Sequence, residues 1–243
     1  MTGAGLLRGP SLNRVLITTV VVIGVVTAVA LAVWVGAFKP YSLPTVSMQP
    51  GLQRGDYMVM MRKTFTGPPR RGDVIVFALP SSGDHEVDYV KRLIGMPGDR
   101  VQLKGGRLFI NDKPVQETPL GVAQGDLPEG RQPVKLYRET TPEGRSYQIE
   151  LAPGFEAAGD TAVYAVPPHC YFVLGDNRDN SVDSRFDPGL APDDPALGGC
   201  GWNEAADRQV GEEPGVGFVA DSKVRGAIVW STSQLRRGRA DAR

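Results

Sequence analysis

The chain has 243 residues, enough for one sizeable domain or two small ones. Its 27 basic residues balance its 27 acidic ones, so electrostatics give no reason to expect nucleic acid as a partner. With 30 glycines, 20 prolines and few aromatic residues, the composition favours a turn-rich β protein over a helical one.

The first predicted element is an uncharged apolar segment at residues 15–38, "VLITTVVVIGVVTAVALAVWVGAF". It exceeds the ~20 residues that a helix needs to cross a hydrocarbon core. A cleaved signal peptide is the main alternative, because Ala28-Val29-Ala30 has the small-x-small pattern of a cleavage site. The apolar run continues through Trp34 and Phe38, however, well beyond a usual ~7–15-residue apolar region. The segment therefore predicts an uncleaved transmembrane helix.

Basic residues around this segment predict its orientation. Arg8, Arg14 and the amino terminus precede it, while Lys39 follows it. The positive-inside rule then favours a cytoplasmic N-terminus and places the rest of the chain outside the cytoplasm. In such a compartment Cys170 and Cys200 could form a disulfide.

Ser47 comes soon after the apolar segment, in the stretch "SLPTVSMQPGL" at residues 42–52. Pro44 and the turn-forming "QPG" flank it, which suits either an ordinary turn serine or a nucleophile. About eight residues separate Phe38 from Ser47 and span at most ~30 Å when extended. A catalytic Ser47 would therefore work close to a bilayer.

The rest of the chain is dominated by short β-rich runs bounded by Gly, Pro or Asp. Residues 100–115 read as a hairpin with Gly105-Gly106 at its turn, and residues 116–160 read as a less regular middle segment. We expect a mainly β, antiparallel domain. Its other strands are predicted at 57–61, 73–79, 89–96, 161–167, 171–176 and 224–231.

A catalytic serine needs a base, and the two histidines are poor candidates for it. His85 and His169 lie in polar loop sequences without an evident orienting motif, which favours ordinary surface histidines. Lys91 is a better candidate, because alternation in "VDYVKRL" places it on an apolar strand face, with Arg92 on the opposite face. Burial lowers the pKa of a lysine and can make it a general base. The alternative is a structural lysine whose stem is buried and whose amine reaches solvent.

The polar run "GDNRDNSVDSR" at residues 175–185 follows an apolar strand and has three interpretations. A calcium loop of the EF-hand type fails, because position six is Ser184 instead of Gly and position twelve is Leu190 instead of Glu. A hydrogen-bonded turn and a network that orients another group both remain open. The acidic, Gly- and Pro-rich residues 187–216 predict a surface loop, and the Arg-rich residues 232–243 predict a frayed tail.

Four of these stretches together resemble the bacterial type I signal peptidases, which are membrane endopeptidases with a Ser–Lys dyad. "PTVSMQPGL" is similar to the family's serine box and "RGDVIVF" to its next box. "DYVKRLIGMPGD" is similar to the lysine box, and "GDNRDNSVDSR" to the last box. The four boxes stand in the family's order after an N-terminal anchor.

The resemblance implies a mechanism and a set of site residues. Ser47 would be the nucleophile and Lys91 its general base, with no metal and no cofactor. The Ser47 backbone N–H and the Thr45 hydroxyl would hold the oxyanion, where many relatives carry serine in place of Thr45. The resemblance further implies that Lys91 is supported by Ser181, Asp183 and Arg185. It implies a substrate-binding role for five residues: Leu43, Pro44, Met48, Tyr89 and Val90.

The resemblance also implies the domain organisation, partners and location of the chain. The partners would be signal peptides of exported preproteins, the lipid bilayer and possible secretion machinery, at the cytoplasmic membrane. Two alternatives are a specialised conjugation-type peptidase with few substrates and an inactive anchored β domain that binds exported chains. The expected segments are a cytoplasmic tail at 1–14, a transmembrane helix at 15–38, an extracytoplasmic catalytic domain at 39–231 and an Arg-rich tail at 232–243. Within the catalytic domain we expect a non-catalytic β lobe at about 104–165 and an acidic insertion at 187–216.

Overall fold

The structure is a computed structural model that describes residues 12–80, 85–152, 159–190, 194–201 and 215–240, with side chains described as far as Arg236. It divides into two compact units, Met1–Lys39 and Pro40–Arg243. The first unit contains helix α1 (Leu12–Ala37), which is long and apolar enough to cross a membrane. The expected helix at 15–38 is therefore present, except that Phe38 already begins a strand.

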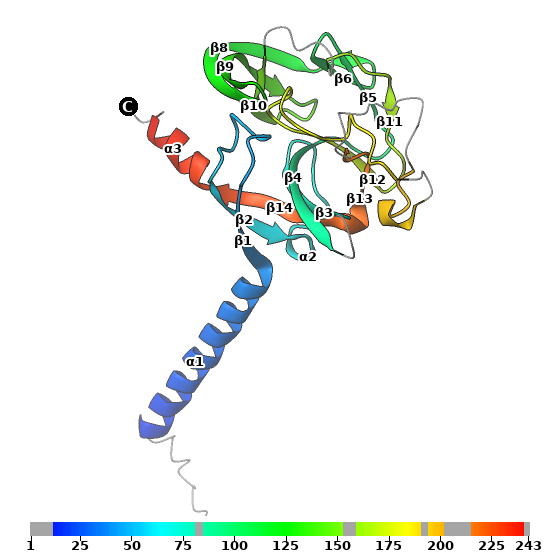
Figure 1. Cartoon of the computed structure of the whole chain (residues 1–243). Helices are drawn as coiled ribbons and strands as arrows, with labels where there is room; N and C mark the ends of the chain where they lie inside the picture. Colours follow the sequence, from blue (N-terminus) through cyan, green and yellow to red (C-terminus); the bar gives the residue numbers. More distant parts are fainter. Residues whose placement is uncertain (1–11, 81–84, 153–158, 191–193, 202–214, 241–243) are drawn as a thin grey trace, which may run out of the picture. The chain divides into compact units, whose positions relative to one another are not determined.

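The main element of the second unit is a mostly antiparallel seven-stranded sheet (Figure 1). Its central strands are buried because their sequences, such as "VIVFALP" and "CYFVL", are nearly continuous apolar runs. All the strands predicted for this sheet are present. In spatial order they are β1 (Phe38–Ser42), β2 (Tyr57–Arg62), β14 (Val224–Ser231), β3 (Val74–Pro80), β4 (Glu86–Gly95), β12 (Cys170–Leu174) and β13 (Val219–Ala220).

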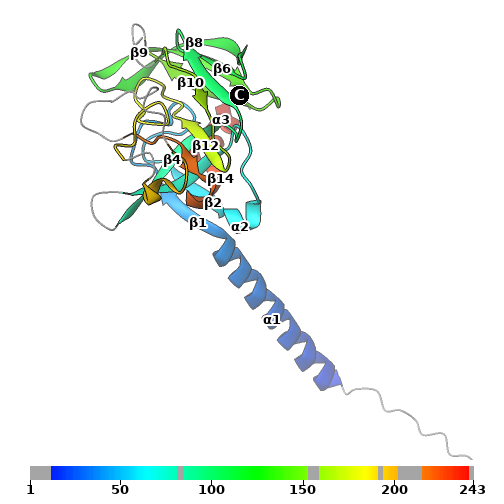
Figure 2. The same ribbon diagram turned by 90° about the vertical axis from the view of Figure 1, so that its right-hand side faces the viewer.

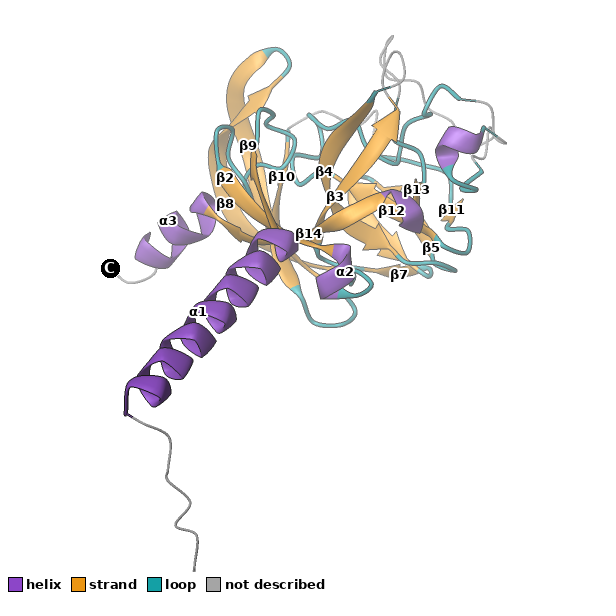
Figure 3. Ribbon diagram, turned by 90° about the horizontal axis from the view of Figure 1, so that it is seen from below, coloured by secondary structure: helices purple, strands orange, loops and turns teal. Residues whose placement is uncertain are grey.

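A second, four-stranded sheet contains the predicted hairpin. Gly105 and Gly106 have positive φ angles of 56° and 77° at its turn, a conformation that glycine adopts at little cost. The short helix α2 (Lys63–Thr66) lies beside the main sheet in Figure 3, and the 3₁₀ turn η3 (Asp221–Lys223) contacts the sheet at β3. The strands of the second sheet are β11 (Tyr164–Ala165), β5 (Arg100–Lys104), β6 (Arg107–Ile110) and β7 (Lys113–Pro114).

The local sequence of residues 116–160 reads as a less regular segment, and that interpretation is wrong, whereas the resemblance placed a β lobe over these residues. The structure forms a three-stranded antiparallel sheet there, from β8 (Gln116–Leu127), β9 (Gly130–Thr140) and β10 (Ser146–Leu151), as Figure 2 shows. The alternation is hidden in the sequence because most of β8 and β9 is exposed. Prolines within both strands and a register shift between Pro119 and Gly121 disguise them further.

The expectation of a frayed tail at 232–243 is also wrong for its described part, which is helix α3 (Thr232–Ala240). Its first turn is fixed by Asp56, a carboxylate with 1 % of its surface exposed. Asp56 accepts hydrogen bonds from Thr232, Ser233 and Arg236. This contact over more than 170 positions could not be read from local sequence.

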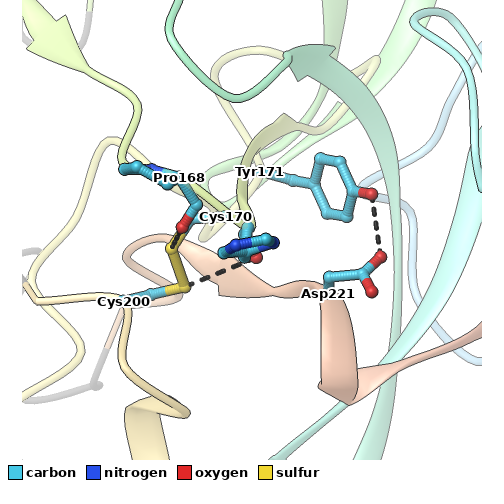
Figure 4. Close-up of a disulfide and its surroundings, with 6 residues drawn as sticks. Pro168, Cys170, Tyr171, Cys200 and Asp221 are labelled. Carbon is cyan, nitrogen blue, oxygen red and sulfur yellow. Dashed lines mark hydrogen bonds between the residues drawn. A yellow bond between two sulfur atoms is a disulfide. The ribbon is translucent and has the colours of Figure 1, made fainter.

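Cys170 and Cys200 form a disulfide, with the two Cα atoms 5.8 Å apart (Figure 4). Both cysteines belong to the main apolar core, together with Phe172 and Phe218. The bond ties the described part of the predicted 187–216 loop, including the 3₁₀ turn η1 (Pro195–Leu197), to strand β12.

Candidate active site

Ser47 lies in a turn whose apolar neighbours fix it to the sheet. Leu43, Met48 and Leu52 are buried in one cluster with Met58 of β2. The Gln49 N–H donates to the Val46 carbonyl over 3.0 Å and closes the turn around the serine. Ser47 is consequently held in place with 8 % of its surface exposed.

Lys91 reaches this serine from β4. Its Nζ lies 2.8 Å from Ser47 Oγ, a hydrogen-bonding distance, and the residue is 5 % exposed. The predicted apolar face is confirmed, because Tyr89 and Leu93 pack into one cluster with Ile75 and Phe77 of β3. Burial disfavours the ammonium and lowers the pKa of Lys91 to about 8. A neutral amine in contact with a serine hydroxyl can accept its proton.

Thr45 lies beside the pair. Its Oγ1 is 3.2 Å from Ser47 Oγ, and either hydroxyl can be the donor. A threonine hydroxyl at this position is close enough to Ser47 Oγ to donate to an oxygen that develops negative charge beside it.

The polar run at residues 175–185 packs against this pair. The Asn177 N–H donates to the Ser47 carbonyl over 3.1 Å. Gly175 allows the close approach, since a Cβ there would lie 2.6 Å from that carbonyl oxygen and 2.2 Å from Ser181 Oγ. Of the readings left open for the run, a buried hydrogen-bonded network is the one observed.

The predicted ion pair within the run is present. Arg185 Nε and Nη2 lie 2.8 and 2.9 Å from the two carboxylate oxygens of Asp183, and both side chains are buried. Burial alone would raise the pKa of Asp183, but the Arg185 guanidinium outweighs it and lowers that pKa. Asp183 is the strongest charge acting to raise the pKa of Lys91, against burial, and Arg185 acts in the opposite direction.

Two of the predicted site residues, Ser181 and Met48, do not make the contacts that their implied roles require. Ser181 Oγ is buried without a hydrogen-bond partner in the described part of the chain, so it makes no direct bond to Lys91 there. Met48 is fully buried in the core instead of facing substrate, because its side chain packs with Leu52 and Met58.

A cleft of about 420 Å³ opens beside Ser47 and Lys91. Its walls are the segment before the serine and the first half of β4, two stretches of extended or turn-like backbone. The other substrate-binding residues predicted from the sequence all lie on it: Leu43, Pro44, Tyr89 and Val90.

The sequence did not indicate several buried partners of these boxes. Arg92 makes a bidentate pair with Asp176 at 2.6 Å for both contacts, and Arg178 pairs with Glu139 of β9 at 2.6 Å. Arg92 and Asp176 belong to the lysine box and the last box, but neither sequence indicates that the two residues pair with each other. Glu139 lies in the segment expected to be irregular, and nothing in its local sequence marks it.

Neither histidine is among the residues that surround Ser47 and Lys91. His85 and His169 are exposed loop residues. Within the described ranges, no group of three or more His, Cys, Asp or Glu side chains is arranged to hold a metal ion.

Comparison with known proteins agrees with this geometry. A profile of the family described as "Signal peptidase, peptidase S26" matches residues 16–202. Signal peptidase I of Rickettsia canadensis is 36% identical over 194 residues, covering 69% of this chain and 71% of the relative. Signal peptidase I of Rickettsia typhi is 35% identical, covering 69% and 72%.

A crystal structure of a signal peptidase I from Enterococcus faecalis is also similar, with 23% identity over 65% of this chain and 95% of the other. Its TM-score of 0.29 is too low to support an argument. The profile and the two Rickettsia relatives suffice: the chain belongs to the signal peptidase family S26 and is a serine peptidase of the type I signal peptidase class.

Proposed function

We propose that this protein is a membrane-anchored endopeptidase that cleaves N-terminal signal peptides from exported preproteins with a Ser47–Lys91 dyad. The observation that carries the proposal is the 2.8 Å contact between Ser47 Oγ and a buried Lys91 whose pKa is lowered to about 8. A lysine with an ordinary pKa of ~10.4 would be almost wholly protonated at neutral pH and could not accept a proton.

The reaction runs through an acyl-enzyme. Ser47 Oγ attacks the scissile carbonyl while neutral Lys91 takes the hydroxyl proton, and the leaving amine recovers a proton from the lysine. Lys91 then activates the water that hydrolyses the ester. The Ser47 N–H and the Thr45 hydroxyl hold the oxyanion, and losing one such donor typically costs ~10²–10³ in turnover.

The cleft supports an extended peptide substrate with small side chains. Backbone on both sides offers hydrogen-bonding groups to an added strand. Leu43 and Tyr89 line this cleft, and side chains of this size next to the dyad favour small residues at the positions just before the cut, as in a small-x-small motif.

The anchor supports a preprotein as substrate. Helix α1 is apolar over its length, and about eight residues connect Phe38 to Ser47, at most ~30 Å when extended. A signal peptide that is itself inserted in the bilayer presents its cleavage site near that depth. The basic residues before α1 support a cytoplasmic N-terminus and a catalytic domain outside the cytoplasm.

Two matched pairs of variants test the dyad in full-length protein in detergent micelles, with a preprotein as substrate. Ser47→Ala and Lys91→Arg should each abolish cleavage, since alanine removes the nucleophile and arginine stays charged. Ser222→Ala and Lys104→Arg, both at exposed positions, should cleave like the unaltered protein. Substantial cleavage by either dyad variant would reject the proposal.

A further inference from the structure

The three-stranded sheet that was expected to be non-catalytic contacts the active site through Asp126, near the end of β8. The Gln49 side-chain amide donates to Asp126 Oδ2 over 2.9 Å. The Asn177 and Asn180 side-chain amides donate to the Asp126 backbone carbonyl over 3.0 and 2.9 Å. One residue of the β8–β9 hairpin therefore joins two stretches that are more than 120 positions apart in the chain.

Each of these partners acts on the nucleophile or on the cleft. Gln49 is 6 % exposed, and its N–H closes the turn that contains Ser47. The Asn177 N–H donates to the Ser47 carbonyl over 3.1 Å. Asn180 lines the cleft, and its N–H donates to Asn177 Oδ1 over 3.1 Å. Gln49 and Asn177, which both bond the backbone around Ser47, thus both donate a side-chain hydrogen bond to Asp126.

We propose that Asp126 is a positioning residue for peptide hydrolysis, an inference that rests on the proposed Ser47–Lys91 dyad. Its carboxylate holds the buried Gln49 amide by a charge-assisted hydrogen bond, which is stronger than a neutral one. Without that acceptor the buried amide is left unsatisfied and the turn shifts to find another partner. Displacements of about 1 Å at a reacting centre cost on the order of 10²-fold in rate, so a smaller adjustment suffices for a measurable loss.

The hairpin itself supplies a matched control. Glu129 is an exposed carboxylate in the β8–β9 turn, three positions from Asp126. Replacing either acid by its amide removes one negative charge from the same hairpin. Glu129→Gln therefore controls for the loss of one negative charge from this hairpin without touching the contact with Gln49.

The test measures kcat, KM and thermal midpoint for full-length variants with a preprotein in detergent micelles. Asp126→Ala should lower kcat about ten-fold with KM changed less than about two-fold, because the substrate contacts are retained. Asp126→Asn should recover part of the loss, since its Oδ1 still accepts from Gln49. Glu129→Gln should match the unaltered protein. Gln49→Ala should lose as much as Asp126→Ala, and the double variant should lose no more than either.

An unchanged kcat in Asp126→Ala would overturn the inference, and so would additive losses in the double variant or a loss that falls on KM alone. If Asp126→Ala does not fold, Gln49→Ala decides, and an unchanged kcat there overturns the inference equally. The dyad is judged separately: cleavage by Ser47→Ala would reject the proposed function, whereas an inactive Ser47→Ala beside a fully active Asp126→Ala would reject only the role of Asp126.

Discussion

Replacing Lys91 by methionine tests whether burial is what makes this lysine a base. Burial lowers the pKa of Lys91 from 10.5 to about 8. Between these values the unfolded chain binds a proton that the folded protein does not, so the folded state gains stability as the pH rises from about 8 to 10.5. With about 1.4 kcal/mol per pH unit, keeping Lys91 buried costs about 3 kcal/mol at pH 7 and about 1 kcal/mol at pH 10.

Methionine has a similar length and no charge, so it removes this cost. Lys91→Met should be inactive. At pH 7 it should nevertheless be more stable than the unaltered protein, because removing the burial cost gains up to about 3 kcal/mol and losing the contact with Ser47 costs about 1 kcal/mol. At pH 10 the difference in free energy of unfolding between the two proteins should be about 2 kcal/mol smaller than at pH 7, because burying Lys91 costs less there. All other titrating groups are shared by the two proteins, so their contributions cancel.

Urea denaturation of both full-length proteins in micelles, at pH 7 and pH 10, measures the two differences. Lys104→Met, at an exposed position, is the control and should show nearly the same difference at both pH values. A Lys91→Met difference that does not change between pH 7 and pH 10 would refute the reasoning, because the lysine would then have an ordinary pKa.

Three further predictions concern activity and the acidic side of the site. The kcat/KM for a preprotein should rise with pH and level off above about 8, because only neutral Lys91 accepts the serine proton; a profile flat from pH 6 to 9 would contradict this. Glu150 is 3 % exposed, and burial, with Asp126, Asp176 and Asp179 nearby, raises its pKa to about 7. The folded state therefore binds a proton that the unfolded state releases above ~4.5, and this stabilisation is lost as the pH rises through 7. The change in thermal midpoint caused by Glu150→Gln should therefore be more stabilising at pH 8 than at pH 5. Equal changes at the two pH values would count against this prediction. Gly175→Ala should reduce cleavage at least about ten-fold, because its Cβ would displace Ser181 and the Ser47 carbonyl, whereas Gly36→Ala, which meets open space in α1, should not.

Local patterns were enough to mark the central pair as candidates, and the family resemblance then implied their roles and those of the supporting residues. Alternation in "VDYVKRL" placed Lys91 on an apolar face, and that face is the one packed against Ile75 and Phe77. The turn residues around Ser47 and the continuous polar run at 175–185 are also local signals, and the Asp183–Arg185 pair lies within one short stretch.

The parts that could not be predicted depend on contacts between distant segments. β8 and β9 are mostly exposed strands interrupted by proline, so their mutual pairing, and not an apolar face, defines them. Helix α3 depends on Asp56, which lies far away in sequence. Glu139 and Asp126 belong to the site only because the three-stranded sheet packs against the polar run.

The arrangement of charges explains how a lysine remains a base beside two aspartates. Asp183 and Asp176 both act to raise the pKa of Lys91, which would leave it protonated. Each carboxylate is held in two contacts by a buried arginine, Asp183 by Arg185 and Asp176 by Arg92. A paired carboxylate presents a dipole instead of a net charge, and the field of a dipole falls off faster with distance. Burial then dominates the pKa of Lys91, while the Asp183 carboxylate also accepts the Gly175 N–H. For the proposed dyad, the two arginines would therefore help to keep Lys91 neutral by offsetting the charge of these carboxylates.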